Sequence, residues 1–227
     1  MVLCYGRNTP YSYDAHTPLS ILCLGTFLET NGIEVEYFDE RVHERARLDE
    51  LLARAPRVVG FSVIGGYQIA SSSRLAERVR ERSPESFIVW GGIAPTALPE
   101  LVLSEPFADC VALGEAEETL LELTRALRAP APDLRAIAGI AFKENGRVII
   151  NARRPPPSVE ELPFVYQGKA RELLAVYLKQ ASIRESVGFE ASRGCPYTCS
   201  FCYSPNFHGA PRVKSHEIGR ASCRERV

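Results

Sequence analysis

Three of the chain's seven cysteines lie within eight residues, at Cys195, Cys199 and Cys202. Their spacing is C-x3-C-x2-C, in the segment RGCPYTCSFCY that begins at Arg193. Cysteine thiolates are common protein ligands of zinc and of iron–sulfur clusters. Three thiolates hold a metal centre but leave one tetrahedral position without a protein ligand. The spacing therefore predicts either a site with a distant fourth ligand or a centre that keeps one position open.

The two alternatives differ in what fills the fourth position. A structural zinc site needs four protein ligands, usually in two pairs. The fourth ligand would then be one of His208, Cys110, Cys4 or Cys223. A 4Fe-4S cluster held by three cysteines instead leaves one iron open to an exogenous ligand. Gly194 and Pro196 favour an irregular loop around the cysteines rather than a helix. The close spacing would wrap one loop around three corners of a cube, and these residues alone leave both kinds of site open.

The elements that must position this loop begin with a regular alternation in the first part of the chain. Apolar strand segments are expected at residues 1–6, 33–39, 57–63, 86–92 and 108–114. Helical patterns lie between and after them, at residues 17–32, 48–56, 68–82, 95–105 and 116–129. Parallel strands need long right-handed crossovers, which helices provide. The pattern predicts an α/β fold, a doubly wound parallel sheet of the Rossmann or flavodoxin-like kind.

The alternation of strand and helix patterns ends after residue 129. Residues 137–151 read as a β-hairpin, because two apolar runs flank Asn145-Gly146, a strong turn signal. We therefore assign residues 1–152 to the first domain. Residues 153–185 open with a proline-stiffened stretch and are expected to be a linker, whose later part, from Lys169 to Glu185, is a patchy helical or extended stretch. Residues 186–216 are expected to start a second domain, with a strand that leads directly into the cysteine loop.

The cysteine loop resembles the cluster loop of the radical S-adenosylmethionine enzymes, a (β/α) partial-barrel family. Their pattern, C-x3-C-x-aromatic-C after the first barrel strand, is matched by Cys195, Cys199, Phe201 and Cys202. The resemblance implies a 4Fe-4S cluster whose open iron is chelated by S-adenosylmethionine. It further implies reductive cleavage of that molecule to a 5′-deoxyadenosyl radical, with Phe201 near the adenine. An electron donor such as flavodoxin or ferredoxin is implied as a partner.

The first domain resembles the cobalamin-binding domains that precede the barrel in many of these enzymes. In doubly wound sheets, ligands lie beyond the carboxyl ends of the strands. The loops there contain Ser62, Gly91, Gly92, Gly114 and Glu115. The resemblance assigns these residues to cobalamin, with Ser62 and the glycine pair at positions that hold the nucleotide tail. Their glycines let a bulky ligand approach the backbone closely.

A histidine ligand to cobalt is not expected from this sequence. Related domains carry an Asp-x-His-x-x-Gly motif after the first strand. Here Asp14-Ala15-His16 is followed by Leu19 where the motif has glycine. His16 also precedes Thr17-Pro18 at the mouth of a helix, where a solvent-exposed histidine is the simpler reading. We expect cobalamin to bind without a histidine ligand.

The amino-acid composition and net charge exclude several classes of protein. Of 227 residues, 45% are hydrophobic and 24% are charged, enough for a buried core and unlike a disordered chain. The net charge of −1 disfavours an extended nucleic-acid surface. No apolar run is long enough for a membrane span. An odd number of clustered cysteines does not suit a disulfide framework, so we expect a cytoplasmic protein.

The expected function is that of a cobalamin-dependent radical S-adenosylmethionine enzyme, most simply methyl transfer to an unactivated carbon of a small-molecule substrate. The alternatives are a corrinoid-binding or sensory module without catalysis, and a radical enzyme whose front domain binds no cobalamin and that performs cyclisation or rearrangement. Only the first barrel strand and the start of its helix are recognised, so we expect an N-terminal fragment that is inactive alone. Residues 217–227 resemble translated sequencing adapter and are expected to be non-native.

Overall fold

The computed structural model describes residues 1–9, 16–179 and 187–215. Its centre is a sheet whose first five strands are parallel, in the order β2-β1-β3-β4-β5. These strands are β1 (Val2–Tyr5), β2 (Glu36–Asp39), β3 (Val58–Ser62), β4 (Phe87–Gly91) and β5 (Cys110–Ala112). The predicted doubly wound α/β fold is therefore confirmed.

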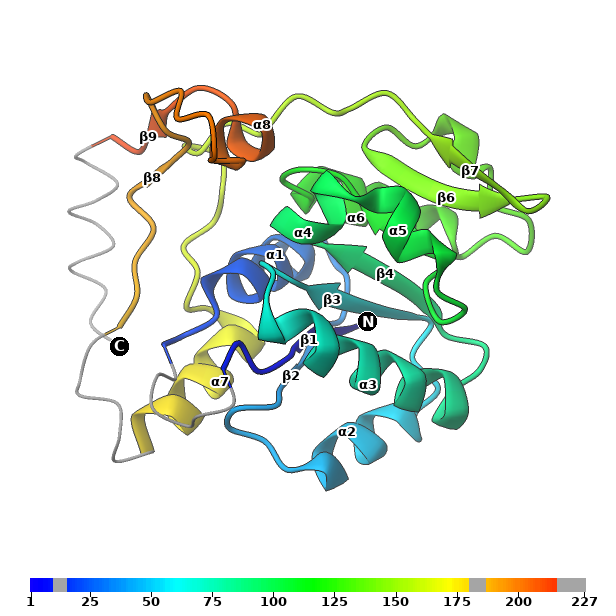
Figure 1. Ribbon diagram of the computed structural model, residues 1–227. Helices are drawn as coiled ribbons and strands as arrows, with labels where there is room; N and C mark the ends of the chain where they lie inside the picture. The colour runs from blue at the N-terminus through cyan, green and yellow to red at the C-terminus, as the bar shows by residue number, and fades with distance from the viewer. Residues whose placement is uncertain (10–15, 180–186, 216–227) are drawn as a thin grey trace.

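Helices cover both faces of the sheet (Figure 1). The connections are α1 (Leu19–Thr30), α2 (Arg45–Leu52), α3 (Tyr67–Arg82), α4 (Ile93–Ala97), α5 (Pro99–Ser104) and α6 (Glu117–Ala126). Successive strand residues point to opposite faces of the sheet, so each strand contributes side chains to two hydrophobic cores. In β1, Leu3 and Tyr5 join the core under α1 and α6, whereas Val2 and Cys4 join the core under α2 and α3. Strands buried on both faces explain their almost continuous apolar sequence.

A hairpin extends the same sheet beyond β5. Strands β6 (Ile140–Glu144) and β7 (Arg147–Ile150) pair antiparallel with each other, and β6 pairs antiparallel with β5. Asn145 and Gly146 both adopt positive φ, at 50° and 75°, which the tight turn between the two strands requires. A short 3-10 turn, η1 (Leu134–Ala136), leads into the hairpin. The hairpin is therefore an edge of the central sheet and not a separate unit.

The stretch expected to be a linker, residues 153–185, contains a helix in its later part. Residues Gly168–Lys179 form helix α7, which packs against α1 and lies beside β2. Its apolar face, with Leu173, Leu174 and Tyr177, is buried in the same core as α1. Burying three large side chains provides a strong hydrophobic driving force, so this stretch docks instead of spanning freely. Residues 180–186 lie outside the described residues.

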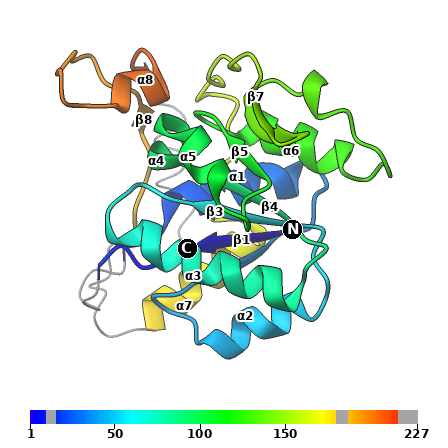
Figure 2. The same cartoon turned by 45° about the vertical axis from the view of Figure 1, so that its right-hand side comes forward.

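The chain then returns to the carboxyl end of the parallel strands. Strands β8 (Ser192–Arg193) and β9 (Arg212–Val213) form a short antiparallel pair, and α8 (Ser204–His208) lies between them in sequence and contacts α4. Both views place α8 at the end of the molecule near α4 (Figures 1 and 2). The cysteine loop connects β8 to α8. Within the described residues, no helix is both long and apolar enough to cross a membrane.

Candidate functional site

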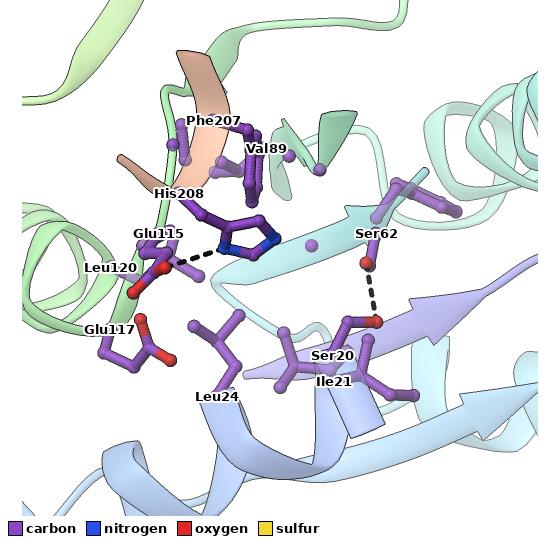
Figure 3. A pocket seen from close by; sticks show the side chains of 18 of the residues that line it. Ser20, Ile21, Leu24, Ser62, Val89, Glu115, Glu117, Leu120, Phe207 and His208 are labelled. Carbon is purple, nitrogen blue, oxygen red and sulfur yellow. Dashed lines mark hydrogen bonds and ion pairs between the residues drawn. The ribbon is translucent and has the colours of Figure 1, made fainter. Parts of the chain in front are cut away.

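A pocket of about 190 Å³ lies where the carboxyl ends of β3, β4 and β5 meet the first turns of α1 and α6. All five residues that the sequence assigned to a corrinoid line it: Ser62, Gly91, Gly92, Gly114 and Glu115. The strands are parallel, so the loops that follow them converge at one edge of the sheet. Apolar side chains form the floor, and two residues of α8 form part of the wall (Figure 3).

Gly91, the last residue of β4, and Gly92, which follows it, are glycine for different structural reasons. Gly92 has φ of +95°, and a Cβ there would lie 2.4 Å from the carbonyl oxygen of Val63. Gly92 is thus required by the turn itself. At Gly91 a Cβ would meet its nearest neighbours only at 3.8 Å or more, which is ordinary contact. The turn does not require glycine at that position, and its absent side chain leaves the pocket wall open.

Ser62 lies opposite α1 across the pocket. Its hydroxyl donates to the hydroxyl of Ser20 at 2.9 Å, and both side chains line the pocket (Figure 3). Ser20 stands near the start of α1, so this pair joins the end of β3 to the first turn of the helix. The two hydroxyls are the polar groups on that side of the pocket, which otherwise presents Ile21 and Leu24.

Glu115 is held by two arginines and a histidine that all come from the cysteine segment. Its carboxylate lies 3.0 Å from Arg193 Nη1, 3.1 Å from Arg212 Nη1 and 2.7 Å from His208 Nδ1. Only 2% of the Glu115 side chain is exposed. Burial alone would favour the neutral acid, but hydrogen bonds from His208 and Arg212 and the charge of Arg193 lower the pKa of Glu115 to about 2. The carboxylate is therefore ionised across the physiological range.

Arg193 is the centre of a second set of contacts. Its guanidinium contacts Glu117 at 2.6 Å and Glu190 at 2.7 Å as well as Glu115. Burial opposes its charge, yet these carboxylates outweigh burial and raise the pKa of Arg193. Burial raises the pKa of Glu117, whose second carboxylate oxygen has no hydrogen-bond partner in the described part of the chain. Arg193 precedes Cys195 by two residues, so this cluster fixes the root of the cysteine loop.

Sequence reasoning missed this charge cluster, because the sequence suggests for Glu115 only a carboxylate in the first turn of a helix or a contact with a ligand. Glu115 and Arg193 are 78 residues apart, and Glu115 and Arg212 are 97 residues apart. The chain contains 27 basic and 28 acidic residues, so charge alone could not identify which of them pair. The sequence suggests His208 only as a fourth zinc ligand, whereas in the structure its Nδ1 contacts Glu115.

The three cysteines of the loop are free thiols on the surface. Cys199 is exposed, and Cys195 and Cys202 are half-buried. The backbone N–H of Cys202 donates to the carbonyl of Cys199 at 3.1 Å. No three His, Cys, Asp or Glu side chains in the described ranges are gathered as ligands of a single metal ion. Phe201 is 91% exposed and faces away from the protein.

The alternative zinc ligands are distant from this loop or engaged elsewhere. Cys4 and Cys110 are fully buried in β1 and β5, where burial raises the pKa of both thiols and keeps them protonated. Cys223 lies outside the described residues, as do the whole of the suspected adapter tail and Asp14-Ala15. His16 is exposed and does not line the pocket.

Comparison with known proteins gives the site a context. A family profile described as "B12 binding domain" matches residues 11–124. The anaerobic magnesium-protoporphyrin IX monomethyl ester cyclase of Synechocystis is 28% identical over 214 residues, covering 88% of this chain and 42% of that protein. An uncharacterized methyltransferase of Pyrococcus horikoshii is 32% identical over 173 residues, which cover 73% of this chain and 35% of that methyltransferase. The chain thus spans less than half the length of either relative.

A solved structure shows the same fold. The cobalamin-dependent S-adenosylmethionine radical enzyme OxsB, with aqua-cobalamin and S-adenosylmethionine bound, superimposes with a TM-score of 0.78. The superposition covers 97% of this chain and 30% of OxsB, at 23% sequence identity. The likeness therefore extends beyond the parallel sheet to the segment that carries the cysteine loop.

Proposed function

Because the chain belongs to the B12-binding domain family, we propose that the pocket at the edge of its sheet binds cobalamin. A volume of about 190 Å³ is below the roughly 300–1,000 Å³ of pockets that enclose whole ligands. The pocket therefore suits one end of a large molecule, and the nucleotide tail of cobalamin is such an end. The observation that carries this proposal is the convergence of Ser62, Gly91, Gly92, Gly114 and Glu115 on one cavity.

The described residues fit this ligand in two further ways. Gly91 leaves the wall open for close approach, and the hydroxyls of Ser62 and Ser20 offer hydrogen bonds beside an apolar floor. Of the two histidines nearest the helix mouth and the pocket, His16 is exposed and His208 belongs to another segment. This supports binding without the histidine of the Asp-x-His-x-x-Gly motif. Glu115 lines the pocket, and its carboxylate contacts Arg193, Arg212 and His208.

We further propose that Cys195, Cys199 and Cys202 hold a 4Fe-4S cluster, with Phe201 contacting S-adenosylmethionine. Three free, accessible thiols and no other ligand of the same kind on the loop suit a centre that keeps one iron open. When bound, the cluster supplies the electron that cleaves S-adenosylmethionine. The protein's own contribution is to anchor the loop through Arg193 and through the β8–β9 pair. Free cysteines throughout the described residues are consistent with a reducing cytoplasm.

The whole protein is then a cobalamin-dependent radical S-adenosylmethionine enzyme, and methyl transfer to an unactivated carbon of a small molecule is the reaction we propose. The methyltransferase among the relatives supports this choice. Cyclisation is the second candidate, because the Synechocystis relative that matches 88% of this chain is a cyclase. An electron donor such as flavodoxin or ferredoxin would supply the electron that reduces the cluster.

Cobalamin binding is tested with a variant whose larger side chain fills the pocket. We expect the 227-residue chain to retain hydroxocobalamin through gel filtration with a base-off visible spectrum, unchanged by His16→Ala. Ser62→Leu should weaken binding at least tenfold, because the leucine occupies the cavity and removes the hydroxyl. Ser104→Leu, the same change at an exposed position in α5, is the control. A folded chain that does not bind cobalamin, or Ser62→Leu binding as tightly as Ser104→Leu, would contradict the proposal.

A further inference from the structure

The pocket has one wall that does not come from the sheet. His208 lies at the end of α8, in the segment that follows the cysteine loop, and it lines the same cavity as Ser62 and Gly91. Its partner Glu115 is 93 residues earlier, just after β5. The cavity is therefore completed only when the cysteine segment docks on the first domain. Anything bound there contacts both parts of the chain.

The orientation of the His208 ring is fixed from two sides. Its Nδ1 lies 2.7 Å from Glu115 Oε1, and the Phe207 ring lies edge-on with its centroid 4.6 Å away. Glu115 is ionised and can only accept, so Nδ1 carries the proton and donates. With Nδ1–H engaged by the carboxylate, Nε2 is the ring nitrogen left for another partner, and in a neutral imidazole that nitrogen is a hydrogen-bond acceptor. The same arrangement orients histidines in many ligand sites.

The free nitrogen faces the cavity. Figure 3 shows Nε2 on the side of the ring away from Glu115, toward the space between His208 and Ser62. No hydrogen bond engages Nε2 within the residues that the structure describes. The side chain is 29% exposed, so this nitrogen is accessible from the pocket and its open mouth. A ligand with a hydrogen-bond donor at this position would meet a pre-oriented acceptor.

We propose that His208, oriented by Glu115, accepts a hydrogen bond from the bound corrinoid through Nε2. This inference rests on the proposed function, that the cavity binds cobalamin. Corrinoids carry primary amides around the ring and a hydroxyl on the ribose of the tail, and either group is a suitable donor. A residue of the cysteine segment thereby becomes part of the corrinoid site. Corrinoid binding and docking of the cysteine loop then reinforce each other.

Two substitutions distinguish the contact made by Nδ1 of His208 from the contact made by Nε2. In His208→Gln the amide oxygen reaches the position of Nε2, so the contact with the corrinoid is kept and the contact with Glu115 is lost. In His208→Asn the amide nitrogen takes the position of Nδ1, so the contact with Glu115 is kept and the contact with the corrinoid is lost. Titrating each full chain with hydroxocobalamin, followed by visible absorbance, should give about tenfold weaker binding for His208→Asn. His208→Gln should remain within about twofold of the unsubstituted chain.

Hydrogen exchange of residues 187–215 in the same variants excludes a purely structural role. Loss of the Glu115 contact should make this segment exchange faster in His208→Gln than in His208→Asn, the reverse of the order of binding. The inference is overturned if the variant whose residues 187–215 exchange faster is also the variant that binds cobalamin more weakly. It is also overturned if both variants bind cobalamin as tightly as the unsubstituted chain. Failure of Ser62→Leu to differ from Ser104→Leu, or of the unsubstituted chain to bind, overturns the proposed function as well. Binding that depends on Ser62 but not on His208 overturns this inference alone.

Discussion

Removing the charge of Glu115 while keeping its shape is the perturbation that most directly probes how the cysteine segment is held. In Glu115→Gln, Arg193 and Arg212 keep their places but lose their shared counterion, and His208 loses an ionised acceptor. Arg193 is only 7% exposed, so water cannot replace the carboxylate. We expect residues 187–215 to undock more often, while the parallel sheet is unaffected.

The magnitude follows from the pKa of Glu115. Its fall from the ordinary value of 4.5 to about 2 corresponds to about 3 kcal/mol of stabilisation. The side chains of Arg212 and His208 are 20% and 29% exposed, so solvent screening lowers the expected value to about 2 kcal/mol. Because the pKa is lowered on folding, this stabilisation is complete above about pH 5 and disappears as the pH falls from 4.5 toward 2.

Native-state hydrogen exchange measures this docking free energy directly. A loss of about 2 kcal/mol corresponds to exchange about 30-fold faster in peptides from residues 187–215 at pH 7. Peptides covering β4 should not change. Glu100→Gln, which removes an exposed carboxylate from the first turn of α5, is the matched control. On acidification, after correction for intrinsic rates, the gap between Glu115→Gln and the unsubstituted chain should shrink.

The reasoning is refuted if Glu115→Gln exchanges at the rate of the Glu100→Gln control. It is also refuted if the difference persists unchanged at pH 2 to 3, because the carboxylate would then contribute through something other than its charge. Faster exchange in β4 as well as in residues 187–215 would show that Glu115 stabilises the sheet and not the docking of the segment.

Two further predictions concern the docked helix and the cysteine loop. Leu174→Ala in α7 removes a side chain that is 1% exposed, and should lower the free energy of unfolding by about 2–5 kcal/mol; Leu178→Ala on the same helix, 45% exposed, should cost less than about 0.5 kcal/mol. Denaturant unfolding followed by the fluorescence of the single tryptophan distinguishes them, and equal effects would mean that α7 is not docked in solution. Single changes of Cys195, Cys199 or Cys202 to Ala should abolish the brown absorbance of a 4Fe-4S cluster after anaerobic reconstitution, whereas Cys23→Ala should preserve it. Full absorbance in any one of the three loop variants would contradict their role as ligands.

The sequence by itself determined the parallel sheet and the location of the pocket. Continuous apolar runs separated by amphipathic stretches specify buried parallel strands with helical crossovers, because few other arrangements bury such strands on both faces. Once the strand order is doubly wound, the loops that carry Ser62, Gly91 and Gly114 must meet at one edge. The turn at Asn145-Gly146 is equally local, since both residues must adopt positive φ. Each of these features depends on residues that are neighbours in the chain.

Only the tertiary structure decided how helix α7 and the cysteine segment contact the first domain. The local pattern of helix α7 is weak and predicts only a patchy helical or extended stretch, yet burial of Leu174 and Tyr177 against α1 determines its position. The role of Glu115 depends on Arg193, His208 and Arg212, which lie 78 to 97 residues away. An ion pair leaves no periodicity in the sequence, and its energy depends on burial, which exists only after folding. The sequence therefore predicts which groups bind the cofactors, and the fold determines which charges hold those groups in place.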